Sequence, residues 1–172
     1  MREDNLYQFP IKGGLQMSTF EDLKSSLARY SAEFRHPSLR QLLVSGIYDL
    51  FPETGTPTNV PAESKWPDPW PNAESAGVYA MLDENLFVRY VGKASMKSSI
   101  GRRLSSYFIY EDRANNKRCK LSHPEGWLAH PRFVVSVPVS LSFESPSIEE
   151  FLILQLLPPE NLQGRPRNEK VD

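Results

Sequence analysis

The sequence has a single cysteine, Cys119, among its 172 residues. One thiol cannot form an intramolecular disulfide, and it cannot supply the several thiolates of a cysteine-rich zinc site. Disulfide-stapled scaffolds and cysteine-rich zinc domains are therefore excluded, and we expect a reducing, cytoplasmic setting.

Long hydrophobic runs are also missing. The N-terminus has no apolar segment of signal-peptide length, and no stretch reaches the roughly 20 apolar residues that a membrane-spanning helix requires. With 40% hydrophobic and 24% charged residues, the composition is that of an ordinary globular protein. We therefore expect a soluble chain with no membrane partner and a real apolar core.

The net charge is close to balanced, at −1, which argues against a uniformly basic nucleic-acid-binding protein. The charge is unevenly distributed, because residues 89–120 contain nine basic residues against two acidic ones. Such a basic stripe suits contact with phosphates, and a solvated, lysine-rich surface is the alternative. The candidate nucleic-acid contacts are Lys97, Arg102, Arg113, Lys117, Arg118 and Lys120.

Two helices are predicted near the start of the chain. Ser18 and Glu21 have capping-box spacing, and apolar residues then recur at helical intervals, which predicts a helix over 19–34. Pro37 is expected to open a second helix, whose apolar stripe ends at Leu50.

Residues 52–72 contain six prolines and two tryptophans, Trp66 and Trp70, without periodicity of either kind. This composition predicts an extended connector whose tryptophans pin it to the domain, with base stacking as the less favoured interpretation. We expect residues 1–76 to form a helical extension with a proline-rich linker, and residues 77–172 to form a separate domain.

The second half of the chain predicts an α+β domain. Alternating β-favouring residues over 77–82 and 86–91 flank turn-forming residues and predict a hairpin. A short helix, a polar and irregular segment, a strand and a last helix are expected to follow over 100–108, 109–131, 133–139 and 147–157.

Two short motifs coincide with the predicted hairpin. Its first strand begins Gly77-Val78-Tyr79, and ten residues later its second strand ends Tyr90-Val91-Gly92-Lys93-Ala94. With the later phrase Arg103-Leu104-Ser105-Ser106-Tyr107-Phe108, this pattern resembles the GIY-YIG nuclease superfamily, especially the N-terminal nuclease domain of the bacterial excinuclease. The literal Gly46-Ile47-Tyr48 has no partner motif at hairpin distance and is interpreted as a helix-packing segment.

The resemblance continues into the last predicted helix, where Glu149, Pro158 and Asn161 fall at the spacing of the family's final motif. It implies a GIY-YIG fold with a small central three-stranded β-sheet flanked by helices, here preceded by a helical extension. The implied catalytic residues are Tyr79, Tyr90, Lys93, Arg103, Tyr107 and Glu149, supported by Gly77, Gly92 and Asn161.

Glu149 is the implied ligand of one Mg²⁺ or Mn²⁺ ion. A carboxylate among apolar helix neighbours is costly unless it is paired or bound to a cation, and hard divalent cations favour oxygen ligands. The family's glutamate precedes the motif's proline by nine residues, which favours Glu149 over Glu150. The alternative is a capping charge in the first turn of a helix that begins with a capping box of Ser147 and Glu150.

By the same resemblance, Tyr79 and Tyr90 flank the scissile phosphate, where one of them positions or deprotonates the attacking water. An unperturbed tyrosine has a pKa of roughly 10, so a base role needs a nearby cation, and ordinary cross-strand packing is the alternative. Arg103 is the implied catalytic arginine. Arg102 is the fallback, because the segment 97–100 lengthens its spacing from Tyr90 relative to excinuclease-like sequences.

The resulting prediction is a metal-dependent endonuclease that hydrolyses DNA phosphodiester bonds, in a restriction, mobile-element or repair role. RNA is not excluded as a substrate. The target is expected to be chosen by the first 76 residues, by the basic loop at 113–120, or by a homodimer or a specificity partner. The alternative is a non-catalytic nucleic-acid-binding module that keeps the GIY-YIG fold.

Overall fold

The computed structural model describes residues 17–55, 59–113 and 116–161, and only the backbone for residues 110–113 and 116–117. Three α-helices, seven β-strands and two short 3₁₀ turns lie in these parts of the chain. The helices are α1 (Phe20–Phe34), α2 (Ile100–Ser105) and α3 (Glu144–Leu156). The strands are β1 (Ile47–Asp49), β2 (Ala62–Lys65), β3 (Gly77–Leu82), β4 (Val88–Ala94), β5 (Phe108–Arg113), β6 (Asn116–Leu121) and β7 (Phe133–Pro138).

The protein is an α+β structure built on a five-stranded sheet in the order β2-β1-β7-β3-β4. Neighbouring strands are antiparallel except β1 and β2, which are parallel. The sheet was expected to have three strands, and this is wrong, because β1 and β2 add two strands to the antiparallel unit β7-β3-β4. Strand β4, which carries the second motif, forms one edge of the sheet.

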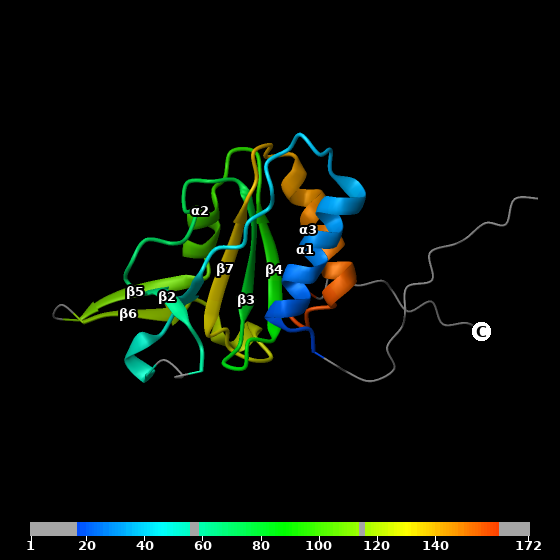
Figure 1. Ribbon diagram of the computed structural model, residues 1–172. Helices are drawn as coiled ribbons and strands as arrows, with labels where there is room; N and C mark the ends of the chain where they lie inside the picture. The colour runs from blue at the N-terminus through cyan, green and yellow to red at the C-terminus, as the bar shows by residue number, and fades with distance from the viewer. Residues whose placement is uncertain (1–16, 56–58, 114–115, 162–172) are drawn as a thin grey trace, which may run out of the picture.

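Both faces of the sheet are covered (Figure 1). Helices α1 and α3 lie side by side on one face, above a core that includes Val78, Ala80 and Leu82 of β3. The other face carries α2 and the β5–β6 ribbon, above a second core that includes Tyr79 and Met81. Alternate residues of β3 therefore enter different cores, as the period of two in a strand requires.

The predicted helix over 19–34 is confirmed as α1, although its cap lies one residue later than expected. The side chain of Thr19 accepts a hydrogen bond from the Asp22 backbone amide, and the Asp22 carboxylate accepts one from the Thr19 amide. These contacts form the capping box that the sequence assigned to Ser18 and Glu21.

The second predicted helix, over 37–50, is wrong, because residues 47–49 form strand β1 between β2 and β7. All three residues of β1 are buried, and a strand buried on both faces has no alternating pattern that distinguishes it from a buried helix. The helix-packing interpretation of Gly46-Ile47-Tyr48 is wrong for the same reason. Tyr48 packs in the core, and its hydroxyl donates a hydrogen bond to the carbonyl oxygen of Asp68.

The proline-rich connector contains strand β2, and its tryptophans are pinned to the domain as predicted. The Trp70 ring lies 4.9 Å from the Tyr48 ring and 5.6 Å from the Phe108 ring, measured between centroids. Because β1 and β2 belong to the same sheet as β3, β4 and β7, the boundary expected after residue 76 runs within one sheet.

The hairpin β3–β4 and the strand β7 are confirmed close to their predicted bounds. Residues 109–131 were expected to be irregular, and this is wrong, because β5 and β6 form an antiparallel ribbon. The last helix begins at Glu144, three residues before the predicted start, and no side chain caps it, so the capping box of Ser147 and Glu150 is also wrong.

Candidate active site

The strand register of β3 and β4 brings the two motifs together. Tyr79 pairs with Gly92, and Met81 pairs with Tyr90. The buried ring of Tyr79 lies directly over Gly92, where an added Cβ would come within 2.5 Å of the Tyr79 hydroxyl oxygen. A side chain at position 92 is incompatible with this position of the Tyr79 ring, so the glycine of the second motif makes room for the tyrosine of the first.

Three tyrosines from different elements form one hydrogen-bonded cluster. Tyr79 on β3 donates a hydrogen bond of 3.3 Å to the Tyr107 hydroxyl, and Tyr107 donates one of 2.9 Å to the Tyr90 hydroxyl on β4. Tyr107 immediately precedes β5, so the turn after α2 delivers it to the face that carries Tyr79. The three sequence-predicted tyrosines therefore share one hydrogen-bond chain.

Burial raises the pKa of two members of this cluster, Tyr79 and Tyr90. Loss of hydration raises the pKa of Tyr79 far above its ordinary value, and the neighbouring Tyr107 and Tyr90 raise it further. Burial, the hydrogen bond from Tyr107 and the charge of Glu149 likewise raise the pKa of Tyr90. The nearby Arg103 lowers both pKa values, but its effect is smaller than that of burial. Both phenols are therefore neutral in the free protein near neutral pH.

Arg103 is the arginine that α2 places beside the tyrosines. Its guanidinium interacts with Tyr79, and this contact is the main reason that the pKa of Arg103 is raised. Ser99 caps α2 by accepting a hydrogen bond from the Arg102 amide, which fixes the start of the helix after the lengthened loop. The loop at 97–100 therefore leaves Arg103 within reach of the cluster.

Lys93 on β4 forms an ion pair with Glu149 on α3. The side chain of Glu149 is 14% exposed and that of Lys93 is 36% exposed, so the carboxylate is the more enclosed partner. Glu149 also lies close enough to Tyr90 to affect its pKa. Glu149 is the sixth residue of α3, so it is not a capping charge in the first turn, and Glu150 is exposed.

The carboxylate that the sequence predicts as a ligand of a divalent cation is that of Glu149. No group of three or more histidine, cysteine, aspartate or glutamate residues suitable for a metal was found in the described parts of the chain. Mg²⁺ commonly binds to one or two carboxylates and keeps several waters. Glu149 is the predicted residue that could serve as this ligand, and a bound cation would compete with Lys93 for it.

Asn161 and Gly77 have backbone roles around the cluster. The Asn161 side chain accepts a hydrogen bond of 2.8 Å from the Val91 amide and donates one of 2.7 Å to the Val91 carbonyl oxygen. It therefore takes the place of a neighbouring strand along the edge of β4, between Tyr90 and Gly92. A Cβ on Gly77 would lie 2.1 Å from the Val137 carbonyl oxygen, so this glycine permits close pairing of β3 and β7.

The candidate nucleic-acid contacts are spread over several elements. Lys97 follows β4, Arg102 lies on α2, and Arg118 and Lys120 lie on β6, and all four are exposed. The side chains of Arg113 and Lys117 lie outside the described residues. Arg89, counted in the basic stripe, is buried and ion-paired with Glu160, so it cannot contact phosphate in this structure.

The sequence missed two residues that shape the site. Trp127 packs its ring against Tyr90 and Tyr107, with centroid distances of 5.9 and 6.2 Å. Glu160 accepts hydrogen bonds from the Leu128 and Ala129 amides and is ion-paired with Arg89. No periodicity marked Trp127, which lies in the segment expected to be irregular, and Glu160 follows two prolines without any recognisable motif of its own.

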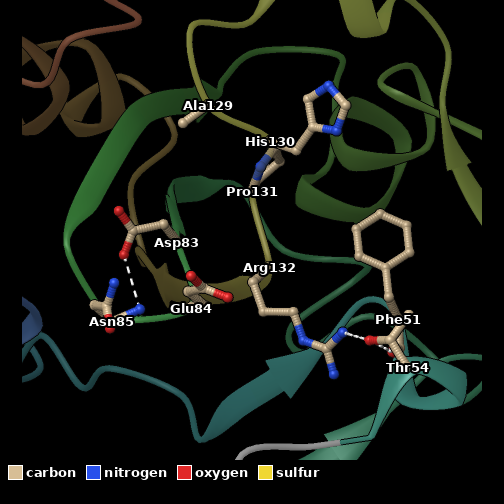
Figure 2. A pocket seen from close by; sticks show the side chains of 9 residues that line it. All are labelled: Phe51, Thr54, Asp83, Glu84, Asn85, Ala129, His130, Pro131 and Arg132. Carbon is tan, nitrogen blue, oxygen red and sulfur yellow. Dashed lines mark hydrogen bonds between the residues drawn. The ribbon is translucent and has the colours of Figure 1, made fainter.

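A separate pocket of about 500 Å³ lies near the turn between β3 and β4 (Figure 2). In its lining, Asp83 accepts hydrogen bonds from the Asn85 and Phe87 amides. Arg132 is bonded to Thr54 and ion-paired with Asp49. None of the sequence-predicted site residues lines this pocket.

No protein-family model matches the chain, and comparisons with curated proteins and with solved structures also find no match. Within the described residues, no helix has the length and apolar character needed to cross a membrane.

Proposed function

We propose that the protein is a GIY-YIG-type endonuclease that hydrolyses phosphodiester bonds in DNA with one divalent cation. The proposal rests on one observation above all: the motif tyrosines form a hydrogen-bonded cluster with Arg103 beside it, and Glu149 lies next to Tyr90. Residues far apart in the sequence thus meet beside β3 and β4, and this meeting supports the proposal.

Each part of this cluster has a chemical task in phosphodiester hydrolysis. Arg103 neutralises charge that develops on the non-bridging oxygens, because its planar guanidinium can donate two parallel hydrogen bonds. Tyr90 is neutral in the free protein and accepts the hydrogen bond from Tyr107, so its own O–H can donate to the phosphate or the attacking water, and the buried Tyr79 holds Tyr107 in place. Positioning is therefore the role proposed for the tyrosines, since their raised pKa values oppose a phenolate base.

Glu149 is the proposed holder of Mg²⁺ or Mn²⁺. When bound, such an ion stabilises negative charge on the phosphate and lowers the pKa of a bound water. Lys93 occupies the Glu149 carboxylate in the free protein, and its ammonium would be available to a phosphate oxygen when the carboxylate holds an ion. The exposed residues Lys97, Arg102, Arg118 and Lys120 are proposed to contact the DNA backbone.

A non-catalytic binding module is the second candidate, and the Lys93–Glu149 ion pair is the observation that favours it. This pair satisfies the Glu149 carboxylate without a metal, so the fold does not depend on a cation. Such a module binds nucleic acid in a salt-dependent manner and cleaves nothing.

The decisive experiment is nicking and linearisation of supercoiled plasmid by the purified protein, with Mg²⁺, with Mn²⁺ and with chelator. Glu149→Gln keeps the shape of the side chain and removes the charge, and Glu150→Gln makes the same change at an exposed neighbour on the same helix. We expect cleavage by the wild type and by Glu150→Gln, and a loss of at least about a hundredfold in Glu149→Gln and Arg103→Ala.

Wild-type protein that binds DNA and RNA without cutting either would favour the binding module. Equal cleavage by Glu149→Gln and the wild type would reject Glu149 as the metal ligand. Parallel assays on single-stranded RNA and duplex RNA decide whether DNA is the substrate.

A further inference from the structure

The loop of residues 127–129 lies beside the tyrosine cluster and projects a leucine into solvent. Leu128 is 74% exposed, and it follows Trp127, whose ring packs nearly perpendicular to the rings of Tyr90 and Tyr107. The loop connects the 3₁₀ turn Pro124–Gly126 to the segment that leads into β7. Leu128 is therefore an apolar side chain placed next to the candidate active site.

Glu160 holds the backbone of this loop in place. Both carboxylate oxygens of Glu160 accept hydrogen bonds from the Leu128 amide, at 3.1 and 3.2 Å, and one of them also accepts from the Ala129 amide at 3.2 Å. The same carboxylate is ion-paired with Arg89 of β4, and the two side chains are 6% and 9% exposed. Leu128 is thus tied to the strand that carries Tyr90.

An enclosed ion pair of this kind is a poor source of stability, because dehydration of both charges offsets their attraction. What Arg89 and Glu160 achieve is geometry: they hold the amides of the 127–129 loop at a set position relative to β4. Exposed leucines are ordinary by themselves, and Leu43 is 63% exposed in this protein. Leu128 differs because it combines exposure, a fixed backbone and closeness to the cluster.

We propose that Leu128 is a wedge that inserts between stacked bases of DNA held at the tyrosine cluster, an inference that rests on the proposed function. Proteins that kink or unwind duplex DNA insert rigidly held apolar side chains, leucine among them, between base steps. Trp127, the residue before the wedge, packs against Tyr90 and Tyr107. The unstacked step then lies within a few nucleotides of the phosphate at Arg103, so the protein selects DNA that is easily unstacked.

The wedge is tested by measuring duplex unwinding without cleavage. Relaxed closed-circular plasmid is incubated with the protein and a metal-independent topoisomerase in chelator, and the change in linking number is read after the protein is removed. The variants are Leu128→Ala, the conservative Leu128→Met, and Leu43→Ala as a matched exposed leucine far along the chain. Nicking with Mn²⁺ is measured on the same preparations, and DNA binding is measured in chelator.

We expect the wild type, Leu128→Met and Leu43→Ala to shift the linking number, and Leu128→Ala to lose most of this shift. Leu128→Ala should still bind DNA within about threefold of the wild type, because phosphate contacts supply most of the non-specific affinity. The wedge proposal is overturned if the wild type nicks DNA without unwinding it, or if Leu128→Ala unwinds DNA as much as the wild type. Either result leaves the nuclease proposal standing.

A wild type that neither binds nor nicks DNA overturns both proposals. Sedimentation of the same samples without DNA gives a further check. If Leu128→Ala abolishes a self-association of the wild type and no unwinding is found, Leu128 belongs to a protein interface and the wedge is rejected.

Discussion

The hydroxyl of Tyr107 donates a 2.9 Å hydrogen bond to the hydroxyl of Tyr90, so the residue that leads into β5 is joined directly to the edge strand β4. Tyr79 donates to the same Tyr107 hydroxyl from β3, the strand next to β4. Burial raises the pKa of Tyr79 and of Tyr90, and the effect on stability can be measured.

The first prediction concerns alkaline pH. In the unfolded chain a tyrosine loses its proton near pH 10, whereas the raised pKa values of Tyr79 and Tyr90 keep both protonated in the folded protein. The unfolded state therefore binds fewer protons above about pH 10. The free energy of unfolding should fall above that pH by up to roughly 1.4 kcal/mol per pH unit for each tyrosine. Below about pH 10 both states keep the proton, so the tyrosines cause no change with pH there.

Urea unfolding at a series of pH values between 8 and 11 measures this slope. Tyr90→Phe removes one of the two groups, so its slope above pH 10 should be smaller than that of the wild type. An unchanged slope in Tyr90→Phe would show that Tyr90 titrates normally in the folded protein.

The second prediction concerns Gly92. A Cβ at this position would overlap the ring of Tyr79, which is fully buried and cannot move aside. Gly92→Ala should therefore destabilise the fold by about 1–3 kcal/mol, as over-packing in a core does. Gly126→Ala is the matched control, because a Cβ there meets no atom within 4 Å. Thermal unfolding compares the two, and equal midpoints would show that the tyrosine cluster tolerates displacement.

The sequence predicted those parts of the fold that have strong local patterns. Strands β3, β4 and β7 and helix α1 each show clear periodicity or turn chemistry in adjacent residues. Strand β1 could not be separated from a helix, because Ile47, Tyr48 and Asp49 are all buried and their stripe fits both. The β5–β6 ribbon was missed for another reason: Cys119 and Leu121 point into the core between exposed, charged neighbours that resemble a loop.

The candidate site was likewise predictable only in part. The motifs give the identities of Tyr79, Tyr90 and Glu149, since these depend on spacing along the chain. The Lys93–Glu149 ion pair joins residues 56 positions apart, and its existence depends on how α3 packs on the edge of the sheet. Trp127 joins the candidate site through contacts of its ring with the rings of Tyr90 and Tyr107. Such contacts are set by tertiary packing, which no local pattern encodes.

The third prediction concerns Asn161. Its side chain satisfies both the amide and the carbonyl of Val91 on the edge of β4, and both bonds are buried. Asn161→Ala leaves a buried donor and a buried acceptor without partners and should cost about 2–4 kcal/mol. Asn161→Asp keeps an acceptor for the Val91 amide, but it faces the Val91 carbonyl with a second oxygen in place of a donor.

Hydrogen exchange at the Val91 amide tests this role. Protection should fall sharply in Asn161→Ala and should be partly retained in Asn161→Asp. Asn85→Ala, at an exposed turn position, is expected to leave the protection of Val91 unchanged.

The last prediction concerns Lys93 as the internal counter-ion of Glu149. Because the Lys93 side chain is 36% exposed, its ion pair stabilises the fold by roughly 1 kcal/mol at most, so Lys93→Met should remain folded. Removing the ammonium frees the carboxylate for a cation, and Mn²⁺ should bind about five- to tenfold more tightly, as judged by electron paramagnetic resonance of the free ion. Lys97→Met, at an exposed lysine of the same charge, should change Mn²⁺ affinity much less. Weaker Mn²⁺ binding in Lys93→Met would mean that the ammonium orients Glu149 for the metal, and binding that survives Glu149→Gln would place the ion elsewhere.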